Sequence, residues 1–217
     1  KRPSPPKPSS KPSTESHLLA LSALLSETRY TLRLFGLIPL WMWGSSTIKS
    51  PPSDPAIRIL TLLQVVSNML YQFLENVGFL ASKGVISKRL IDRFGGIDKW
   101  YLWSIRAWFG HIFLQFVKLW RQRVLQRERS ERNERERALR QEKGEEVQLM
   151  KEIEDEKEEI RLENREWWKS LVNNTFWALP CLHWCFESGI GFPEHLVGLF
   201  SFSAGAWELK DSWAGTG

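Results

Sequence analysis

The sequence predicts an all-α fold: a membrane-associated helical bundle with amphipathic and membrane-embedded helices and a long charged excursion, helical or disordered. Three observations predict it. Apolar residues recur at helical spacing, a run from Arg121 to Lys169 holds 14 basic and 15 acidic residues, and the twelve tryptophans among 217 residues stand mostly at the edges of apolar stretches. Indole favours the headgroup level of a bilayer, although a Trp-rich soluble core is the alternative interpretation.

Outside the charged run the chain is apolar and basic, which its overall composition does not show. Mean hydropathy is −0.31, a value lowered by the charged run. Outside that run the chain carries 16 basic and 10 acidic residues. This excess suits anionic membrane lipids as partners, and because it is thinly spread and no nucleic-acid-binding motif accompanies it, we expect no nucleic-acid partner.

Changes in amino-acid composition along the chain predict four regions. Residues 1–16 form a disordered tail rich in Pro, Ser and Lys, 17–121 hold the N-terminal amphipathic and membrane-associated helices, 122–166 are the charged insertion, and 167–217 are a C-terminal membrane-embedded segment. The chain begins at Lys1, so we expect its true start to lie upstream.

The first predicted helix, between residues 18 and 35, is amphipathic. Arg29 and Arg33 lie on its polar stripe, where they are expected to contact lipid phosphate. Packing of its leucines inside a protein bundle is the alternative, and Pro39 and the stretch 44–52 are expected to break the helix. The predicted membrane-inserting face consists of Leu18, Leu21, Leu25, Leu32 and Phe35.

A second helix is predicted to begin with Asp54 as the N-cap and Pro55 at its first position, and to end near Leu80 or Ala81. The polar residues of this otherwise apolar helix share one line, which indicates packing against protein or headgroups. The same line could mark a solute path, so the second functional hypothesis is a membrane channel or transporter of small solutes. The polar line consists of Gln64, Asn68, Gln72 and Glu75.

A third helix, aromatic-rich, is predicted from Lys99 to Arg121 with Asp98 as its cap. Arg106 and Lys118 lie within it and leave open whether it spans a bilayer. The predicted interface anchors of this helix and of the C-terminal segment are Trp100, Trp103, Trp120 and Trp207.

The charged run is expected to be a solvated, partly helical excursion. Acidic and basic residues four apart stabilise its first half, whereas like charges at this spacing repel one another in its second half. Its apolar positions are too few for a sustained heptad, so a coiled coil is the less favoured interpretation.

The C-terminal part is apolar from Trp167 to Trp184, broken by glycines and Pro193, and helical again from His195 to Trp207. Gly198, Ser201 and Gly205 form a small-residue face that suits helix packing and self-association. Cys181 and Cys185 are expected to be buried thiols, because a structural metal site needs two further ligands. No cofactor, metal or catalytic motif is indicated, and we expect no enzyme.

Five blocks, in order and over about two thirds of the chain, resemble the peroxin 11 (peroxisomal biogenesis factor 11) family, in particular its fungal members akin to the gamma type. They are LLSETRYTLRLFGLIPLW, LLQVVSNMLYQFLENVGFLASKGVI, RLIDRFGGIDKWYLWSIRAWFGHIFLQF, LVNNTFWALPCLHWCFESGIG and FSAGAWELKDSW.

The resemblance implies a peroxisomal membrane protein that elongates the membrane before fission and so controls peroxisome number and size. It also implies an all-helical fold, an amphipathic helix that bends the cytosolic leaflet, a membrane-embedded helix toward the C-terminus, homo-oligomers, and contact with the fission machinery. The remodelling helix carries over onto residues 18–40, with Arg29 and Arg33 at the basic positions.

Overall fold

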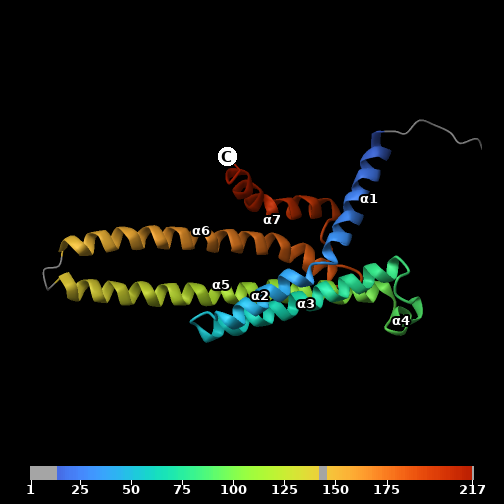
Figure 1. The fold of residues 1–217 in the computed structure, drawn as a ribbon. Coiled ribbons are helices and arrows are strands. Elements are labelled where there is room, and N and C mark those ends of the chain that lie inside the picture. The colour runs from blue at the N-terminus through green and yellow to red at the C-terminus, as the bar shows by residue number, and fades with distance from the viewer. Residues whose placement is uncertain (1–13, 142–145, 217) are drawn as a thin grey trace, which may run out of the picture.

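The computed structural model describes residues 14–141 and 146–216, and over these residues it consists of helices and connecting turns (Figure 1). The predicted all-α fold is confirmed. In chain order the helices are α1 (Thr14–Arg33), α2 (Leu37–Lys49), α3 (Pro55–Ser82), α4 (Lys88–Arg93), α5 (Ile97–Gln141), α6 (Glu146–Trp184) and α7 (Glu194–Ala214).

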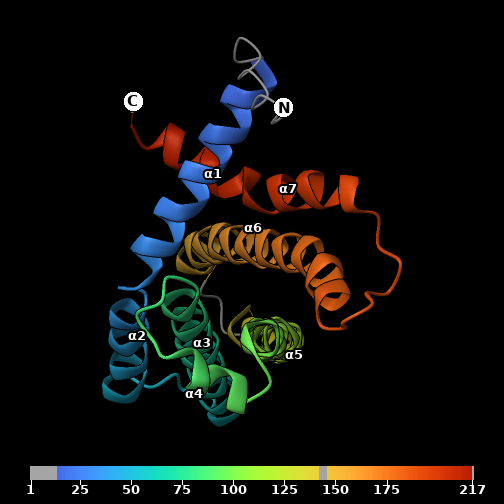
Figure 2. The same cartoon turned by 90° about the vertical axis from the view of Figure 1, so that its right-hand side faces the viewer.

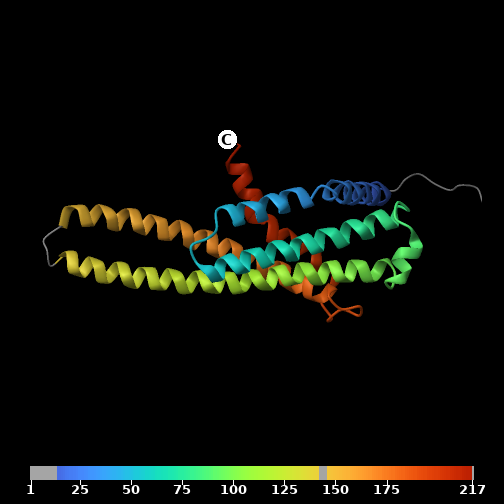
Figure 3. The same ribbon diagram turned by 60° about the horizontal axis from the view of Figure 1, so that its bottom comes forward.

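The molecule is elongated, and two long antiparallel helices set its length. Helices α5 and α6 lie side by side, α3 lies along the first half of α5, and α2 packs on α3 (Figures 1 and 3). Helix α7 crosses α6 on the side away from α5, as the end-on view in Figure 2 shows. Helix α1 projects from this body, and only its last turns contact α3.

Helix α3 begins as predicted. The Asp54 carboxylate accepts a hydrogen bond from the backbone N–H of Ile57 at 2.8 Å, and Pro55 occupies the first position, where no N–H is needed. The helix ends at Ser82, and Gly84 follows with a φ of 75°, a left-handed conformation that glycine adopts without a steric penalty. This end lies one or two residues beyond the predicted one.

Helix α2 departs from the prediction that Pro39 and the following glycine-containing stretch break the chain. The first break lies at residues 34–36, and Pro39 is the third residue of α2. The predicted stretch 44–52 does break the chain, but only from Ser50, after α2 ends at Lys49. Proline is tolerated there because the first N–H groups of a helix have no intrahelical partner. Gly44 lies inside α2, where a Cβ atom would approach Val65 Cγ1 to 2.9 Å, so the glycine permits close packing on α3.

The start of α5 also differs from the prediction. The helix begins at Ile97, so Asp98 lies in its first turn and is not its cap. Gly95 and Gly96 have φ values of 96° and 87°, and this pair of left-handed residues reverses the chain directly before Ile97. Asp98 still suits the positive end of the helix dipole.

The charged run, described up to residue 141 and again from 146, is helical and forms an antiparallel hairpin. Arg129 of α5 lies 2.5 Å from Glu163 of α6, and Arg137 pairs with Glu156, which also accepts a hydrogen bond from Asn133 at 2.7 Å. The expected solvated excursion is therefore a pair of helices, because the basic residues of the first half meet the acidic residues of the second.

A small core joins α3, α5 and the end of α6. Val65, Ile112 and Leu119 are buried, and so is Cys181, whose thiol lies 3.7 Å from the carbonyl oxygen of Ile105. Both cysteines are buried free thiols, as expected. Arg106, which left spanning by α5 open, donates to the carbonyl oxygen of Cys185 at 3.1 Å, directly after the end of α6.

Candidate membrane-contact surface

Helix α3 is polar on its inner side and apolar on its outer side. Gln64, Gln72 and Glu75 are buried, with exposed fractions of 0 %, 6 % and 7 %. The opposite stripe is exposed at spacings of three and four residues, the period of one helix face. It consists of Ile59, Leu63, Val66, Leu70 and Phe73. A helix at the surface of a water-soluble globule has the reverse arrangement.

The buried polar line is occupied by hydrogen bonds to α5. The Gln64 amide donates to Gln115 Oε1 at 2.5 Å, and Asn68 Nδ2 lies 2.9 Å from His111 Nδ1. Burial lowers the pKa of the His111 imidazole, because the charged form would lose its hydration. A neutral ring can accept the Asn68 hydrogen bond. This half of the line thus serves helix packing.

The other half of the line holds α1. Gln72 donates to the carbonyl oxygen of Arg33 at 2.9 Å, and Arg33 Nη1 donates to Glu75 Oε1 at 2.7 Å and to the Tyr71 hydroxyl at 2.9 Å. One turn earlier, Tyr30 stacks on Phe79 with ring centroids 5.4 Å apart. The line therefore ties the C-terminal end of α1 to α3.

The predicted inserting face of α1 has no packing partner among the described residues. Four of its residues, Leu18, Leu21, Leu25 and Leu32, lie on α1, whereas Phe35 lies in the turn after it; all five are between 50 % and 67 % exposed. The alternative, in which these leucines pack inside a bundle of this chain, is wrong for the described residues, since α1 projects from the body (Figures 1 and 2).

The exposed apolar surface extends beyond the predicted residues. Leu19 and Leu24 widen it on α1. Helix α2 continues this surface, because it packs on α3 and its own large apolar side chains face outward. These are Ile38, Trp41, Met42 and Ile48. We call the exposed apolar side chains of α1, α2 and α3 together the apolar face. A patch of this extent indicates an interaction surface.

The two predicted phosphate contacts have different surroundings. Arg29 is exposed, and its guanidinium lies 5.2 Å from the ring centroid of Tyr30. Arg33 is held by Glu75 and Tyr71, with 36 % of its side chain still exposed. Arg29 is thus the freer cation of the pair.

The predicted anchors differ in exposure. Trp120 is the most exposed of them, Trp103 and Trp207 are exposed to a smaller extent, and Trp100 is half-buried beside Phe94. The Trp100 Nε1–H has no hydrogen-bond partner among the described residues.

The small-residue face of α7 does not pack on the rest of the described chain. Nothing lies within 4 Å of a Cβ atom added to Gly198 or Gly205, and Ser201 is half-buried. Helix α7 uses other residues against α6, where Ala204 is buried and Phe200 meets Phe176 with ring centroids 5.3 Å apart.

By length and composition α3 alone among the described helices could cross a membrane. Its 28 residues span about 42 Å at 1.5 Å per residue, more than the hydrocarbon core of about 30 Å. Within the described part of the chain no group of histidine, cysteine and carboxylate side chains could hold a metal ion.

Comparison with known proteins identifies a relationship over most of the chain. The family model described as peroxisomal biogenesis factor 11 matches residues 6–213. No curated protein and no solved structure gives a significant match.

Proposed function

The chain belongs to the peroxisomal biogenesis factor 11 family, and we propose that it elongates the peroxisomal membrane before fission by inserting the apolar face of α1 into one leaflet. Membership makes it a peroxisomal membrane protein with a role in peroxisome proliferation and fission, in a family of biogenesis factors rather than enzymes. The finer assignment to fungal members akin to the gamma type, and contact with the fission machinery, belong to this proposal.

The inverted polarity of α1, α2 and α3 carries the proposal. Large apolar side chains are exposed along these helices, while Gln64, Gln72 and Glu75 are buried between helices. In water these apolar side chains would stay hydrated, and the protein would gain no free energy from burying them. Against lipid the tails accept the apolar side chains of α3, while its inner polar side chains form hydrogen bonds between helices, with Gln64 Oε1 and Glu75 Oε2 left without a partner among the described residues.

Burial of leucines supplies most of the free energy of insertion. Transfer of one exposed leucine side chain into an apolar phase is worth about 1.5 to 3 kcal/mol, whereas a basic residue beside an anionic membrane contributes about 1 kcal/mol. Leu18, Leu21, Leu25 and Leu32 together therefore outweigh Arg29 several-fold. Insertion into one leaflet expands it relative to the other, which bends the membrane.

Other predicted residues have supporting roles in this proposal. Arg29 contacts lipid phosphate, Arg33 fixes the angle of α1 through Glu75 and retains an exposed side for phosphate, and the interfacial tryptophans set the depth of the body. Copies gathered on one patch would add their effects, and the small-residue face of α7 is the proposed site of self-association.

Tubulation of anionic liposomes by the full chain tests the mechanism. We expect Leu25→Glu with Leu32→Glu to abolish tubulation, because two apolar groups are replaced by carboxylates on the inserting face. The matched control is Leu139→Glu with Leu162→Glu, which changes two exposed leucines of the α5–α6 hairpin away from the apolar face (61 % and 50 % exposed, against 60 % and 67 %). Equal tubulation by the α1 variant and the control variant would remove α1 from the mechanism.

Solute passage along the polar line is the alternative, and the contacts favour membrane remodelling over it. Gln64, Asn68, Gln72 and Glu75 are engaged with α5 and α1 rather than with an open path. Solute flux through reconstituted vesicles that is lost in Glu75→Ala would favour the channel.

A further inference from the structure

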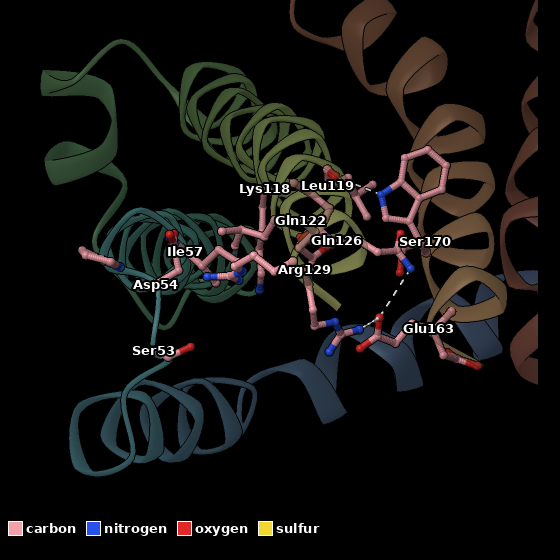
Figure 4. Close-up of a pocket in the computed structure, with 16 residues that line it drawn as sticks. Ser53, Asp54, Ile57, Lys118, Leu119, Gln122, Gln126, Arg129, Glu163 and Ser170 are labelled. Carbon is pink, nitrogen blue, oxygen red and sulfur yellow. Dashed lines mark hydrogen bonds and ion pairs between the residues drawn. The ribbon is translucent and has the colours of Figure 1, made fainter. Parts of the chain in front are cut away.

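A cleft of about 760 Å³ lies between the N-terminal end of α3, the middle of α5 and the facing part of α6. The side chains labelled in Figure 4 include Asp54 at the N-cap of α3, Ile57 from α3, Lys118, Gln122 and Arg129 from α5, and Glu163 and Ser170 from α6. It is remote in sequence from the inserting face of α1, and none of its lining residues was predicted to form a site.

The carboxylates that line the cleft already have cationic partners. Each lies within 2.7 Å of an arginine or lysine nitrogen, so the cleft offers no free acidic group for a metal or an amine. The pairs are Asp54 with Arg121, Glu163 with Arg129, and Glu166 with Lys169.

Lys118 is one of two cations that line the cleft without an ion pair to a described residue, and the more buried of the two. It is half-buried in the cleft and makes no hydrogen bond or ion pair with the described residues. Burial lowers the pKa of its ammonium group, because the charged form has lost part of its hydration without a compensating partner. An unpaired cation in such a place costs folding free energy, and a ligand that neutralises it would recover that cost.

Side chains that can donate hydrogen bonds line the same cleft as this ammonium group. Gln115 and Gln122 lie one helical turn to either side of Lys118 and line the same cleft, as does the hydroxyl-bearing Ser170 of α6. Arg132 adds a second cation that pairs with no described residue. A cation with amide and hydroxyl donors is the set that binds a phosphate group, whose oxygens are acceptors.

We propose that the cleft between α3, α5 and α6 binds a phosphate group, with Lys118 as its principal charge and the side chains of Gln122 and Ser170 as additional donors. The phosphate enters either on a lipid headgroup or on a small soluble phosphate ester. This site acts separately from insertion of α1, so failure of one proposal leaves the other standing.

Calorimetric titration of the full chain in a neutral detergent tests the proposal. The probes are inorganic phosphate, glycerol 3-phosphate and dihexanoyl phosphatidic acid. Because a hydrogen bond to a charged group is a strong contact, we expect Lys118→Gln to weaken binding tenfold or more, and Lys118→Arg to retain it. The control Lys88→Gln removes an exposed lysine of α4, outside the cleft, and should bind as the unchanged protein does.

The three probes distinguish the two sources of phosphate. Binding of dihexanoyl phosphatidic acid at least tenfold tighter than glycerol 3-phosphate assigns the cleft to a lipid headgroup. A smaller difference, or tighter binding of glycerol 3-phosphate, assigns it to a soluble ester. Absence of binding by the unchanged protein, or equal affinity in Lys118→Gln, overturns the proposal.

A second measurement separates binding from folding. Because Lys118 is an unpaired half-buried cation, its replacement by glutamine should leave the thermal unfolding midpoint unchanged or raise it in the absence of phosphate. A lowered midpoint would show that Lys118 supports the fold and would overturn its assignment as a phosphate-binding residue.

Discussion

Arg33 Nη1 of α1 lies 2.7 Å from Glu75 Oε1 of α3, and this ion pair joins the projecting helix to the body of the protein. The Glu75 side chain is 9 % exposed, and its second oxygen has no hydrogen-bond partner among the described residues. The Glu75 charge therefore depends on Arg33, and loss of Arg33 would leave it buried and poorly compensated.

Loss of the ion pair between Arg33 and Glu75 is expected to release α1 from α3. Arg33→Met should increase hydrogen–deuterium exchange in α1 and α2, because the buried carboxylate loses its cation, and Glu75→Gln in the same chain should partly restore protection. The control is Arg29→Met, one turn earlier, where no ion pair with the described residues is lost. Equal exchange in the Arg33 and Arg29 variants would mean that the ion pair does not hold α1.

Arg29 itself is expected to act on lipid affinity. Arg29→Gln should weaken binding to anionic vesicles about fivefold, the equivalent of about 1 kcal/mol, and the difference should shrink as salt screens the charge. Arg29→Lys keeps the charge and should bind normally. Co-sedimentation with vesicles at two salt concentrations measures both effects, and a loss that is independent of salt would argue against a phosphate contact.

The pair between Asp54 and Arg121 predicts a dependence of stability on pH. The hydrogen bond from Arg121, 2.7 Å away, lowers the pKa of the Asp54 carboxyl below its usual value of about 3.9. Asp54 has a lower pKa in the folded state than in the unfolded state. The pair therefore stabilises the fold at pH values above the unfolded-state pKa, and this contribution is lost as the pH falls through the folded-state pKa.

Thermal unfolding between pH 7 and pH 3 tests this dependence by circular dichroism. Asp54→Asn should lower the midpoint at pH 7 and reduce its fall toward pH 3. Asp92→Asn, which changes a carboxylate of α4 that has no described ion pair, is the control and should follow the unchanged protein. Parallel curves for all three proteins would contradict a role of the pair in stability.

Close packing of α2 on α3 predicts the effect of a side chain at Gly44. A Cβ atom there would lie 2.9 Å from Val65 Cγ1, so Gly44→Val should destabilise the fold by about 1 to 3 kcal/mol through overpacking. Gly198→Ala, at a position with open space, should be neutral or stabilise α7 by about 0.5 to 1 kcal/mol. Denaturant unfolding compares the two, and tolerance of valine at position 44 would show that α2 can move away from α3.

Local signals in the sequence determined part of this structure in advance. Asp54 followed by Pro55 predicted the start of α3, because a cap and a first-turn proline act within four residues. The polar and apolar stripes of α1 and α3 were also readable, because helical period alone places residues on a face. The exposure of the α1 leucines could not be predicted in this way, since helical period does not show whether a face packs on protein or contacts solvent or lipid.

Features that depend on distant residues were missed. Pro39 predicts a break, and this local signal conceals α2 and its apolar outer side. The like charges in the second half of the charged run indicate repulsion, but Glu156 and Glu159 pair with Arg137 and Arg129 of α5, 19 and 30 residues earlier in the chain. The sequence places Lys118 within the third helix and does not predict a binding site there, because its cleft exists only when α3, α5 and α6 come together.

The central claim, that the apolar face contacts lipid, is tested most directly by single cysteine substitutions that carry a spin label in liposomes. Burial raises the pKa of the Cys181 and Cys185 thiols, which reduces their reactivity, so labelling is directed to an introduced cysteine. Labels at Leu25→Cys and Leu63→Cys should collide more with oxygen, which concentrates in lipid, than with a water-soluble nickel chelate. A label at Leu139→Cys should show the reverse. If all three labels favour the nickel chelate, the apolar face lies in water and the account is contradicted.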